Sequence, residues 1–257
     1  MTVLILGGTA EARELAAALA AEGYDVVTSL AGRVRDPALP LGRLRIGGFG
    51  GVGGMADYLR TSVISAIVDA THPFATAISA NAAAAAQCTG TPLLRLERPG
   101  WAGHPRAGSW TWVSDVKAAR AAGERSSRPL LTIGRQSLQT FLPWAERPVT
   151  ARVVDPPDFT LPASWHLLTS RGPYSYPDEQ RILIDHRIDL LITKDSGGTH
   201  TAAKLDAAAD LGVGVVVIAR PVRAGGSVVA TVAEAKAWCD VELGTPGTPD
   251  HPGRRDH

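Results

Sequence analysis

Short apolar runs alternate with Ala- and Leu-rich helical stretches along almost the whole chain, and this alternation restricts the possible folds more than any other feature. In the first half, strands are expected at 3–6, 25–29, 44–46, 66–70 and 93–96, and helices at 11–22, 55–61 and 75–88. Strands separated by helices pair in parallel through right-handed crossovers. The first half therefore predicts one parallel sheet of the Rossmann type.

A stretch rich in Pro and Gly, 99–108, interrupts the pattern, which then starts again. Strands are expected at 110–113, 129–133, 149–154, 165–168, 190–193, 214–219 and 228–230, and helices at 115–122, 178–186, 201–211 and 231–243. Beyond residue 244 the chain has no apolar face. These features predict an N-terminal dinucleotide-binding domain (1–113), a C-terminal α/β domain (114–244) and a disordered tail (245–257).

The expected fold class is α/β, with two Rossmann-like domains that each contain a parallel sheet. Ligands of such open sheets bind beyond the carboxyl ends of the strands. With two sheets, we expect the active site in a cleft between the domains. Residues that directly follow a strand are therefore the first candidates for function.

A glycine turn, Gly7-Gly8-Thr9, follows the first strand and precedes a helix. Without side chains at two positions, the backbone can approach a pyrophosphate, and the helix N-terminus supplies free N–H groups. The usual GxGxxG/A fingerprint is matched only in part, because Thr9 stands at the position of its second glycine, between Gly7 and Ala12. An ordinary strand-to-helix turn remains the alternative.

The end of the second strand carries no acidic residue that would bind a ribose 2′-hydroxyl. It reads Ser29-Leu30-Ala31-Gly32-Arg33 instead. A hydroxyl and a guanidinium suit a 2′-phosphate, and this favours NADPH over NADH. A solvated loop cation is the alternative reading of Arg33.

Two further turns extend the expected cofactor site. The glycines of the run at 47–51 let the backbone lie close to a planar ligand, although the run is equally compatible with a flexible loop. After the fourth strand, His72 is placed to donate a hydrogen bond or a proton, although a lone histidine is more often structural. The full set expected to bind the cofactor is Gly7, Gly8, Thr9, Glu11, Ala12, Arg13, Ser29, Ala31, Gly32, Arg33, Gly47, Gly48, Phe49, Thr71, His72 and Pro73.

Cations follow several segments of the second half, namely Arg135, Arg171, Lys194 and Arg220. Together they predict a basic surface for a substrate with several carboxylates, although each cation alone has an ordinary surface reading. Small residues after Lys194 also suit an anion-binding nest of backbone N–H groups. The expected substrate-binding residues are the four cations with Ser196, Gly197 and Gly198.

The composition of the chain limits the classes of binding partner that we expect. A formal net charge of +1 gives no reason to expect nucleic acid or an acidic membrane surface. The two cysteines, Cys88 and Cys239, lack CxxC spacing and are expected to be small buried apolar residues, so no metal site is predicted. No apolar stretch is long enough to cross a bilayer, no signal peptide is evident, and no coiled coil or long apolar edge is present. We expect a cytoplasmic enzyme that is a monomer.

The motifs taken together resemble the precorrin-6A reductase family of the cobalamin pathway. The resemblance runs in order through nearly the whole chain, up to about Leu243. Its pieces are LILGGTAEAR (core 6–13), DATHPFA (69–75), RLERP (95–99), TIGRQ (132–136), TSRGPYS (169–175), TKDSGG (193–198), AKLDAA (203–208) and VIARP (217–221). In that family the form G-G-T-x-E-A-R is the expected variant of the turn, so the resemblance implies that Thr9 supplies a hydroxyl.

The resemblance implies that NADPH delivers a hydride to a double bond of the precorrin-6A macrocycle, giving precorrin-6B. Acetate and propionate groups of that tetrapyrrole suit the predicted basic surface. A proton must also reach the ring, and His72, Asp195 or water are the candidate donors. Two alternatives stay open: a cobalt-precorrin-6A reductase of the anaerobic branch, for which NADH is a further candidate cofactor, and a non-catalytic protein that binds a nucleotide or a tetrapyrrole.

Overall fold

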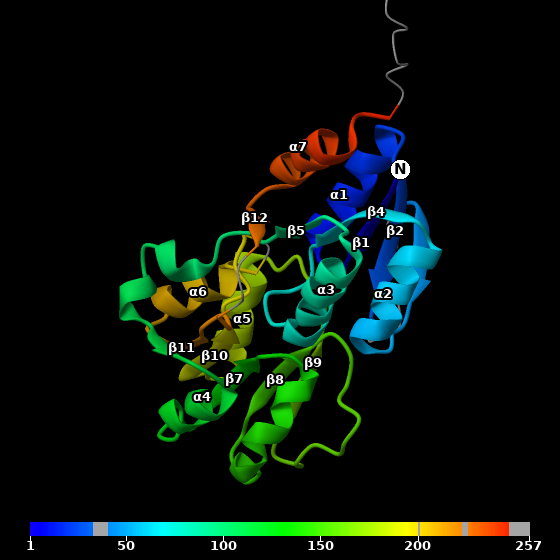
Figure 1. Ribbon diagram of the computed structural model, residues 1–257. Coiled ribbons are helices and arrows are strands. Elements are labelled where there is room, and N and C mark those ends of the chain that lie inside the picture. The colour runs from blue at the N-terminus through cyan, green and yellow to red at the C-terminus, as the bar shows by residue number, and fades with distance from the viewer. Residues whose placement is uncertain (33–40, 200, 223–225, 247–257) are drawn as a thin grey trace, which may run out of the picture. The chain divides into compact units, whose positions relative to one another are not determined.

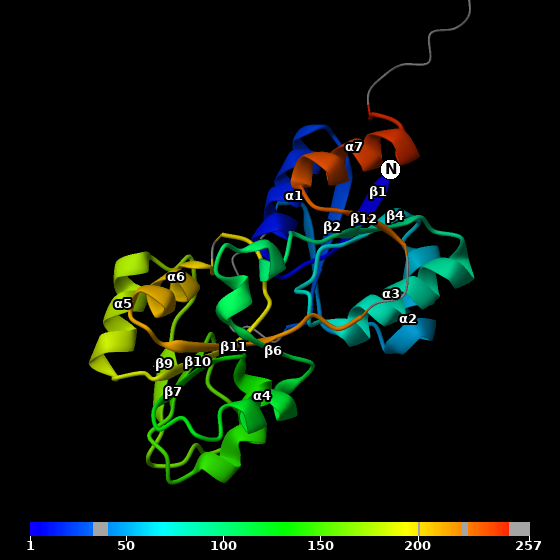
Figure 2. The ribbon, with the colours of Figure 1, turned by 90° about the vertical axis from the view of Figure 1, so that its left-hand side faces the viewer.

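The computed structural model describes residues 1–32, 41–199, 201–222 and 226–246 (Figures 1 and 2). The chain divides into two compact units. Unit 1 holds Met1–Glu97 and the C-terminal part of the chain from residue 224, and unit 2 holds Arg98–Arg223. Most of the predicted tail, from residue 247 onward, lies outside the described residues.

Unit 1 contains a six-stranded sheet in the order β12-β5-β4-β1-β2-β3, with parallel pairing at every step. Its strands are β1 (Thr2–Leu6), β2 (Asp25–Leu30), β3 (Arg43–Ile46), β4 (Ile64–Asp69), β5 (Leu93–Leu96) and β12 (Ser227–Val229). Val3 and Ile5 face α1 (Ala10–Ala21) and α7 (Val232–Leu243), whereas Leu4 and Leu6 face α2 (Gly51–Thr61) and α3 (Thr76–Thr89). This alternation of period two buries both faces of the sheet under helices.

Unit 2 contains a second parallel six-stranded sheet, in the order β6-β11-β10-β7-β8-β9. Its strands are β6 (Thr111–Val113), β7 (Pro129–Thr132), β8 (Thr150–Val153), β9 (His166–Thr169), β10 (Leu190–Lys194) and β11 (Gly214–Ile218). Leu130, Leu191 and Val217 pack against α5 (Tyr176–Asp185) and α6 (Ala203–Asp210). A short α4 (Val116–Ala122) follows β6. The two sheets confirm the predicted α/β class with two Rossmann-like units.

The predicted boundary at 113/114 differs from the division that the structure shows, which falls at Glu97/Arg98 and again after residue 223. β6 pairs with β11 in unit 2, whereas β12 pairs with β5 in unit 1. α7 then buries Ala235 and Cys239 in the apolar cluster that α1 forms. Both strands are short and lie at sheet edges, where one partner strand satisfies the backbone, so their apolar pattern does not reveal which sheet they join.

Several local features also depart from the sequence prediction. α2 begins at Gly51, inside the stretch predicted as a glycine loop, and a 3-10 helix occupies Arg135–Trp144 (η3). Two short 3-10 turns, Trp101–Gly103 (η1) and Ala107–Ser109 (η2), lie within the Pro- and Gly-rich interruption. Cys239 is buried as expected, but Cys88 is exposed, because its position on α3 faces away from the sheet.

Two kinds of feature, a membrane-spanning helix and a metal site, are absent from the part of the chain that the structure describes. No helix there is long and apolar enough to cross a membrane. The same residues contain no group of three or more His, Cys, Asp or Glu side chains able to hold a metal ion.

Candidate active site

The glycine turn after β1 leaves its backbone open to a ligand. The Gly7 amide donates to the Ser29 carbonyl at 2.9 Å, and a Cβ atom at Gly7 would lie 2.9 Å from Thr28 Cγ2. Gly8 has a φ of +111°, and a Cβ atom there would have nothing within 4 Å. A side chain is therefore excluded at residue 7, and space remains above residue 8. These features fit the approach of a pyrophosphate to the N-terminus of α1.

Thr9 has a structural task within this turn. Its hydroxyl accepts a hydrogen bond from the Ala12 amide at 3.1 Å, which caps α1. The same hydroxyl donates to the Ala70 carbonyl at 2.8 Å, and the residue is 8% exposed. Thr9 thus ties the turn after β1 to the end of β4. Its hydroxyl proton is engaged within the protein, so the open backbone of Gly8 and the exposed Arg13 are better placed to meet a phosphate.

The ends of β2 and β3 lie side by side. Ser29 is buried in β2 and is paired in register with Arg45 of β3. The Gly47 amide donates to the Leu30 carbonyl at 2.9 Å. Gly32 has a φ of +69°, and a Cβ atom there would lie 3.1 Å from Ile46 Cγ2. Arg33, which was predicted to bind the 2′-phosphate, lies outside the described residues.

The loop at Gly47-Gly48-Phe49 is held by Arg45, a residue that the sequence did not single out. Arg45 donates from Nη1 to the Gly47 carbonyl at 2.7 Å and from Nη2 to the Gly48 carbonyl at 2.9 Å. Its guanidinium carbon lies 3.7 Å from the centroid of the Phe49 ring, which is buried and also contacts Tyr58. The loop therefore offers a ligand its backbone at Gly47 and Gly48, and not the face of Phe49.

Arg95 fixes the turn that carries His72. Its Nη1 lies 2.6 Å from Asp69 Oδ2, and its Nε lies 2.9 Å from Glu97 Oε2. It also donates to the Thr71 carbonyl and hydroxyl, both at 3.0 Å, while Asp69 Oδ1 accepts the Thr71 amide. Side chains at the ends of β4 and β5 thus hold the backbone before His72. The contacts within this network were not predicted, because its members come from two strands and the segments that follow them.

His72 is half-buried, and its ring orientation is set by its own turn. The Phe74 amide donates to His72 Nδ1 at 3.2 Å. A nitrogen that accepts a hydrogen bond carries no proton, so the neutral ring has its proton on Nε2. His72 therefore presents a donor at Nε2, and Pro73 follows it in the turn.

In unit 2, the loop after β10 is fastened to the first residues of the unit. Asp195 is 5% exposed, and its Oδ1 accepts the Trp101 amide at 2.9 Å. Arg220 Nε lies 3.4 Å from Asp195 Oδ2, and Arg220 Nη1 donates to the Arg98 carbonyl at 2.9 Å. Both carboxylate oxygens of Asp195 thus have partners within the protein. A carboxyl group engaged in this way is better suited to positioning the loop than to delivering a proton.

The predicted anion nest is partly occupied by the protein itself. The Ser196 amide donates to the Lys194 carbonyl at 2.7 Å, and the Gly198 amide donates to the Pro99 carbonyl at 3.2 Å. Gly197 and Gly198 have φ values of +67° and +69°. The two glycines are thus required by the tight loop, and two of its amides already have protein acceptors.

Of the four predicted cations, Lys194 is the last residue of β10 and the other three follow strands of the second sheet, but their surroundings differ. Lys194 donates to Ser137 Oγ at 3.0 Å, and burial lowers the pKa of its ammonium group. Arg135 bonds to the Pro156 carbonyl and lies 3.3 Å from Asp158. Arg171 is exposed, with no hydrogen-bond or ion-pair partner among the residues that the structure describes. Arg171 is therefore the cation most accessible to a carboxylate from solution.

A buried charged cluster, which the sequence did not single out, lies under the loop that carries Arg171. Arg152 pairs with Glu179 at 2.6 Å and lies 4.0 Å from the ring centroid of Tyr174, which follows that loop. Lys204 is 3% exposed, lies 4.6 Å from the ring centroid of Trp101 and donates to the Thr201 carbonyl. Burial lowers the pKa of Lys204 to about 7. The available signal was its position one turn before Ala208, on the apolar face of α6.

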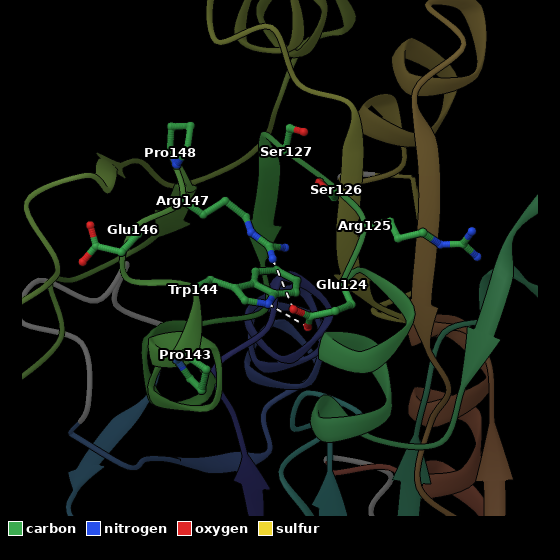
Figure 3. A pocket seen from close by; sticks show the side chains of 9 residues that line it. All are labelled: Glu124, Arg125, Ser126, Ser127, Pro143, Trp144, Glu146, Arg147 and Pro148. Atoms are coloured by element: carbon green, nitrogen blue, oxygen red, sulfur yellow. Dashed lines mark hydrogen bonds and ion pairs between the residues drawn. The ribbon is translucent and has the colours of Figure 1, made fainter.

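An open pocket of about 520 Å³ lies at the amino ends of β7 and β8, formed by residues that precede these two strands (Figure 3). Figure 3 shows Glu124 bonded to Trp144 and Arg147 inside it, while Arg125 points away. The remaining lining residues are Ser126, Ser127, Pro143, Glu146 and Pro148. Because ligands of parallel sheets bind at the carboxyl ends of the strands, this pocket is not assigned to the active site. The cleft between the domains stays a prediction.

The parallel sheets and the open glycine turn of unit 1 define an α/β protein of the Rossmann-like class. Comparison with known proteins gives the particular family. The family described as precorrin-6x reductase CbiJ/CobK matches residues 2–240. The chain belongs to this family and is an oxidoreductase.

Individual relatives agree with the family. Precorrin-6A reductase of Rhodococcus erythropolis is 50% identical over 240 residues, which cover 92% of this chain and 96% of that protein. A solved structure of CobK precorrin-6A reductase superimposes with a TM-score of 0.90 at 39% identity and covers 96% of this chain and 99% of its own. Cobalt-precorrin-6A reductase of Priestia megaterium is 31% identical over 249 residues, which cover 90% and 95% of the two chains.

Proposed function

We propose that this chain reduces precorrin-6A to precorrin-6B with NADPH in cobalamin biosynthesis. The observation that carries the proposal is the match to the reductase family through residues 2–240. Identity of 50% to a precorrin-6A reductase, against 31% to a cobalt-precorrin-6A reductase, favours the metal-free substrate over the cobalt-loaded one.

The open turn at Gly7 and Gly8 is our proposed site for the pyrophosphate, and the ends of β2 and β3 are the proposed site for the adenosine half. The absence of an acidic residue from 29–33 supports NADPH over NADH. The cofactor, when bound, supplies a hydride to one carbon of the substrate. The residues of unit 1 orient it: Gly8 leaves room, Thr9 fixes the helix, and Arg45 fixes the loop at Gly47.

His72 is our proposed proton donor to the neighbouring position of the reduced bond. Its turn is held by Arg95 and Asp69, and its Nε2 carries the proton of the neutral ring. Loss of this proton alone would turn the neutral ring into imidazolate, so we expect a solvent proton to return to Nε2 as the first one leaves, which keeps the ring neutral. Asp195 is assigned a positioning role, because its carboxylate is engaged by Trp101 and Arg220.

The tetrapyrrole carboxylates are proposed to bind to the cations of unit 2, with Arg171 as the first contact. Arg135, Lys194 and Arg220 already have protein partners, so they contribute through the positive potential they add or by exchanging partners. Ser196, Gly197 and Gly198 keep the loop after β10 in shape. The cytoplasmic location and the monomeric state stay predictions.

Turnover assays with four combinations test the proposal: metal-free or cobalt-loaded precorrin-6A, each with NADPH or NADH. The expected result is rapid loss of the reduced-nicotinamide absorption with metal-free substrate and NADPH. Preference for the cobalt-loaded substrate would move the chain to the anaerobic branch. Tight binding of the tetrapyrrole without any oxidation of the nicotinamide would identify a non-catalytic binding protein.

His72→Asn and His72→Gln separate proton donation from structure. Asn is short and can imitate Nδ1 as the acceptor for the Phe74 amide, whereas Gln reaches toward the position of Nε2. If His72 delivers the proton, both variants lose single-turnover reduction even at saturating NADPH. Near-normal reduction by either variant would exclude His72 as an essential acid.

A further inference from the structure

Arg45 lies where a cofactor is expected to bind in unit 1, and its protein partners accept only some of its N–H groups. It stands next to the last residue of β3, and in register beside Ser29 of β2. Its contacts with the Gly47 and Gly48 carbonyls and with the Phe49 ring hold the guanidinium at the carboxyl end of these two strands. In an open parallel sheet, this is the end at which the adenosine part of a dinucleotide binds.

The Arg45 side chain has N–H groups that do not donate to the loop. A guanidinium carries five N–H groups, and two of them go to the Gly47 and Gly48 carbonyls. The other three have no acceptor among the residues that the structure describes, and Arg45 is only half-buried. Beside it, a Cβ atom at Gly47 or at Gly48 would have nothing within 4 Å, so the loop leaves open space there.

Other described cations of unit 1 occupy different places. Arg43 lies on the same strand but pairs with Asp25 at the opposite, amino end. Arg95 is bonded to Asp69 and Glu97 at the ends of β4 and β5. Arg60 lies in the last turn of α2, and Lys236 lies on α7. Arg13 lies on α1, beside the glycine turn. Within the described part of unit 1, Arg45 is thus the cation located at the ends of β2 and β3.

We propose that Arg45 is a specificity-determining residue for the cofactor, which binds the 2′-phosphate of NADPH with the N–H groups that it does not use on the Gly47–Phe49 loop. This inference rests on the proposed use of NADPH. The loop contacts fix the guanidinium before the cofactor arrives, so little side-chain freedom is lost on binding. A planar guanidinium with paired donors suits phosphate oxygens better than an ammonium group does. NADH lacks this phosphate and gains nothing from the contact.

The test measures dissociation constants of NADP⁺, NAD⁺, 2′,5′-ADP and 5′-AMP by calorimetry, with no tetrapyrrole present. The variants are Arg45→Met, Arg45→Lys and the matched control Arg43→Met, which removes the same charge from the other end of β3. Arg45→Met is expected to weaken NADP⁺ and 2′,5′-ADP by about 10- to 100-fold more than it weakens NAD⁺ and 5′-AMP, because only the first two lose a charged hydrogen bond, whereas all four lose the loop contacts of Arg45. Arg45→Lys should keep part of the selectivity, and Arg43→Met should keep all of it.

Equal weakening of NADP⁺ and NAD⁺ by Arg45→Met would overturn the inference, because Arg45 would then act only on the loop. Unchanged binding of all four ligands would overturn it as well. Equal binding of NADP⁺ and NAD⁺ by the unaltered protein would refute the proposed preference for NADPH, and the role of Arg45 with it. The proposed reduction of precorrin-6A would still be testable with either nucleotide. Selective binding of NADP⁺ by a protein that does not reduce precorrin-6A would refute the proposed reaction and leave the role of Arg45 standing.

Discussion

Replacing Arg95 by Met tests the network that holds the His72 turn. The substitution keeps an apolar stem of similar length and removes the cation that lies between Asp69 and Glu97. The side chains of Arg95 and Asp69 are 10% and 5% exposed, and their charged atoms lie 2.6 Å apart. Removing one partner of such a buried pair leaves an uncompensated charge and destabilises a fold by about 3–5 kcal/mol. Asp69 keeps its hydrogen bonds from Thr71, so we expect a loss near the lower limit, about 3 kcal/mol.

That loss is measurable as a shift of the urea midpoint of unit 1. With a slope of about 2 kcal/mol per molar urea, a loss of about 3 kcal/mol lowers the midpoint by about 1.5 M. The two units need not unfold together, so hydrogen-exchange mass spectrometry of peptides from β1 and β4 is the appropriate readout. Asp69→Asn combined with Arg95→Met should recover part of the loss, because the stranded carboxylate is then neutral.

Arg60→Met is the matched control. Arg60 pairs with Asp57 on the surface of α2, where the two side chains are 56% and 77% exposed. Exposed pairs of this kind contribute at most about 0.5 kcal/mol, so the midpoint should move by less than about 0.3 M. Equal shifts for Arg95→Met and Arg60→Met would refute the claim that the buried network fixes the turn.

Three further variants test other parts of the account. Gly8→Ala should lower the affinity for NADP⁺ at least about tenfold, because its methyl group enters the space left for the pyrophosphate. Gly90→Ala is the matched control, because Gly90 also has a positive φ and open space around it. Each substitution should cost about 1 kcal/mol of stability, but Gly90→Ala should leave NADP⁺ binding unchanged. Thr9→Val removes the cap of α1 and the bond to Ala70, and should cost about 1–2 kcal/mol in a chemical unfolding experiment. The pKa of Lys204 is lowered from 10.5 to about 7 in the fold, so this residue destabilises the protein fully below that value and progressively less as the pH rises toward 10.5. Lys204→Met should therefore raise the melting temperature at about pH 6 and have a much smaller effect at about pH 10; a constant difference across this range would contradict the burial of an ionisable amine.

Much of the fold follows from the sequence, because the strands are buried on both faces and therefore carry short, dense apolar runs. The runs at 3–6 and 190–193 predicted β1 and β10 to within a residue. The edge strands β6 and β12 were also found, but they were assigned to the wrong units, because an edge strand has a single partner that its own residues do not specify. The first turn of α2 was not predicted, because it contains Gly51, Gly53 and Gly54, and glycine has a low helix propensity.

In the candidate site, too, local features could be predicted from the sequence and long-range contacts could not. Turn residues such as Gly7 and Gly8 were recognisable, because the backbone geometry they permit is a local property. The residues that hold the turns, Arg45 and Arg95, were not recognisable, because an arginine at a strand end looks the same in sequence whether it is solvated, bonded to backbone carbonyls as Arg45 is, or paired with a buried carboxylate as Arg95 is. For Asp195, the sequence suggested a proton donor, but partners at Trp101 and Arg220 lie far away along the chain and favour a positioning role.

A single-turnover reduction with NADPH deuterated at the transferring position tests the central claim most directly. The chain is mixed under anaerobic conditions with metal-free precorrin-6A, and the tetrapyrrole product is analysed by mass spectrometry and NMR. Our account predicts that each turnover oxidises one NADPH and places one deuterium on a ring carbon, with the second hydrogen coming from solvent. A product without deuterium, or consumption of NADPH with the macrocycle unchanged, would contradict it.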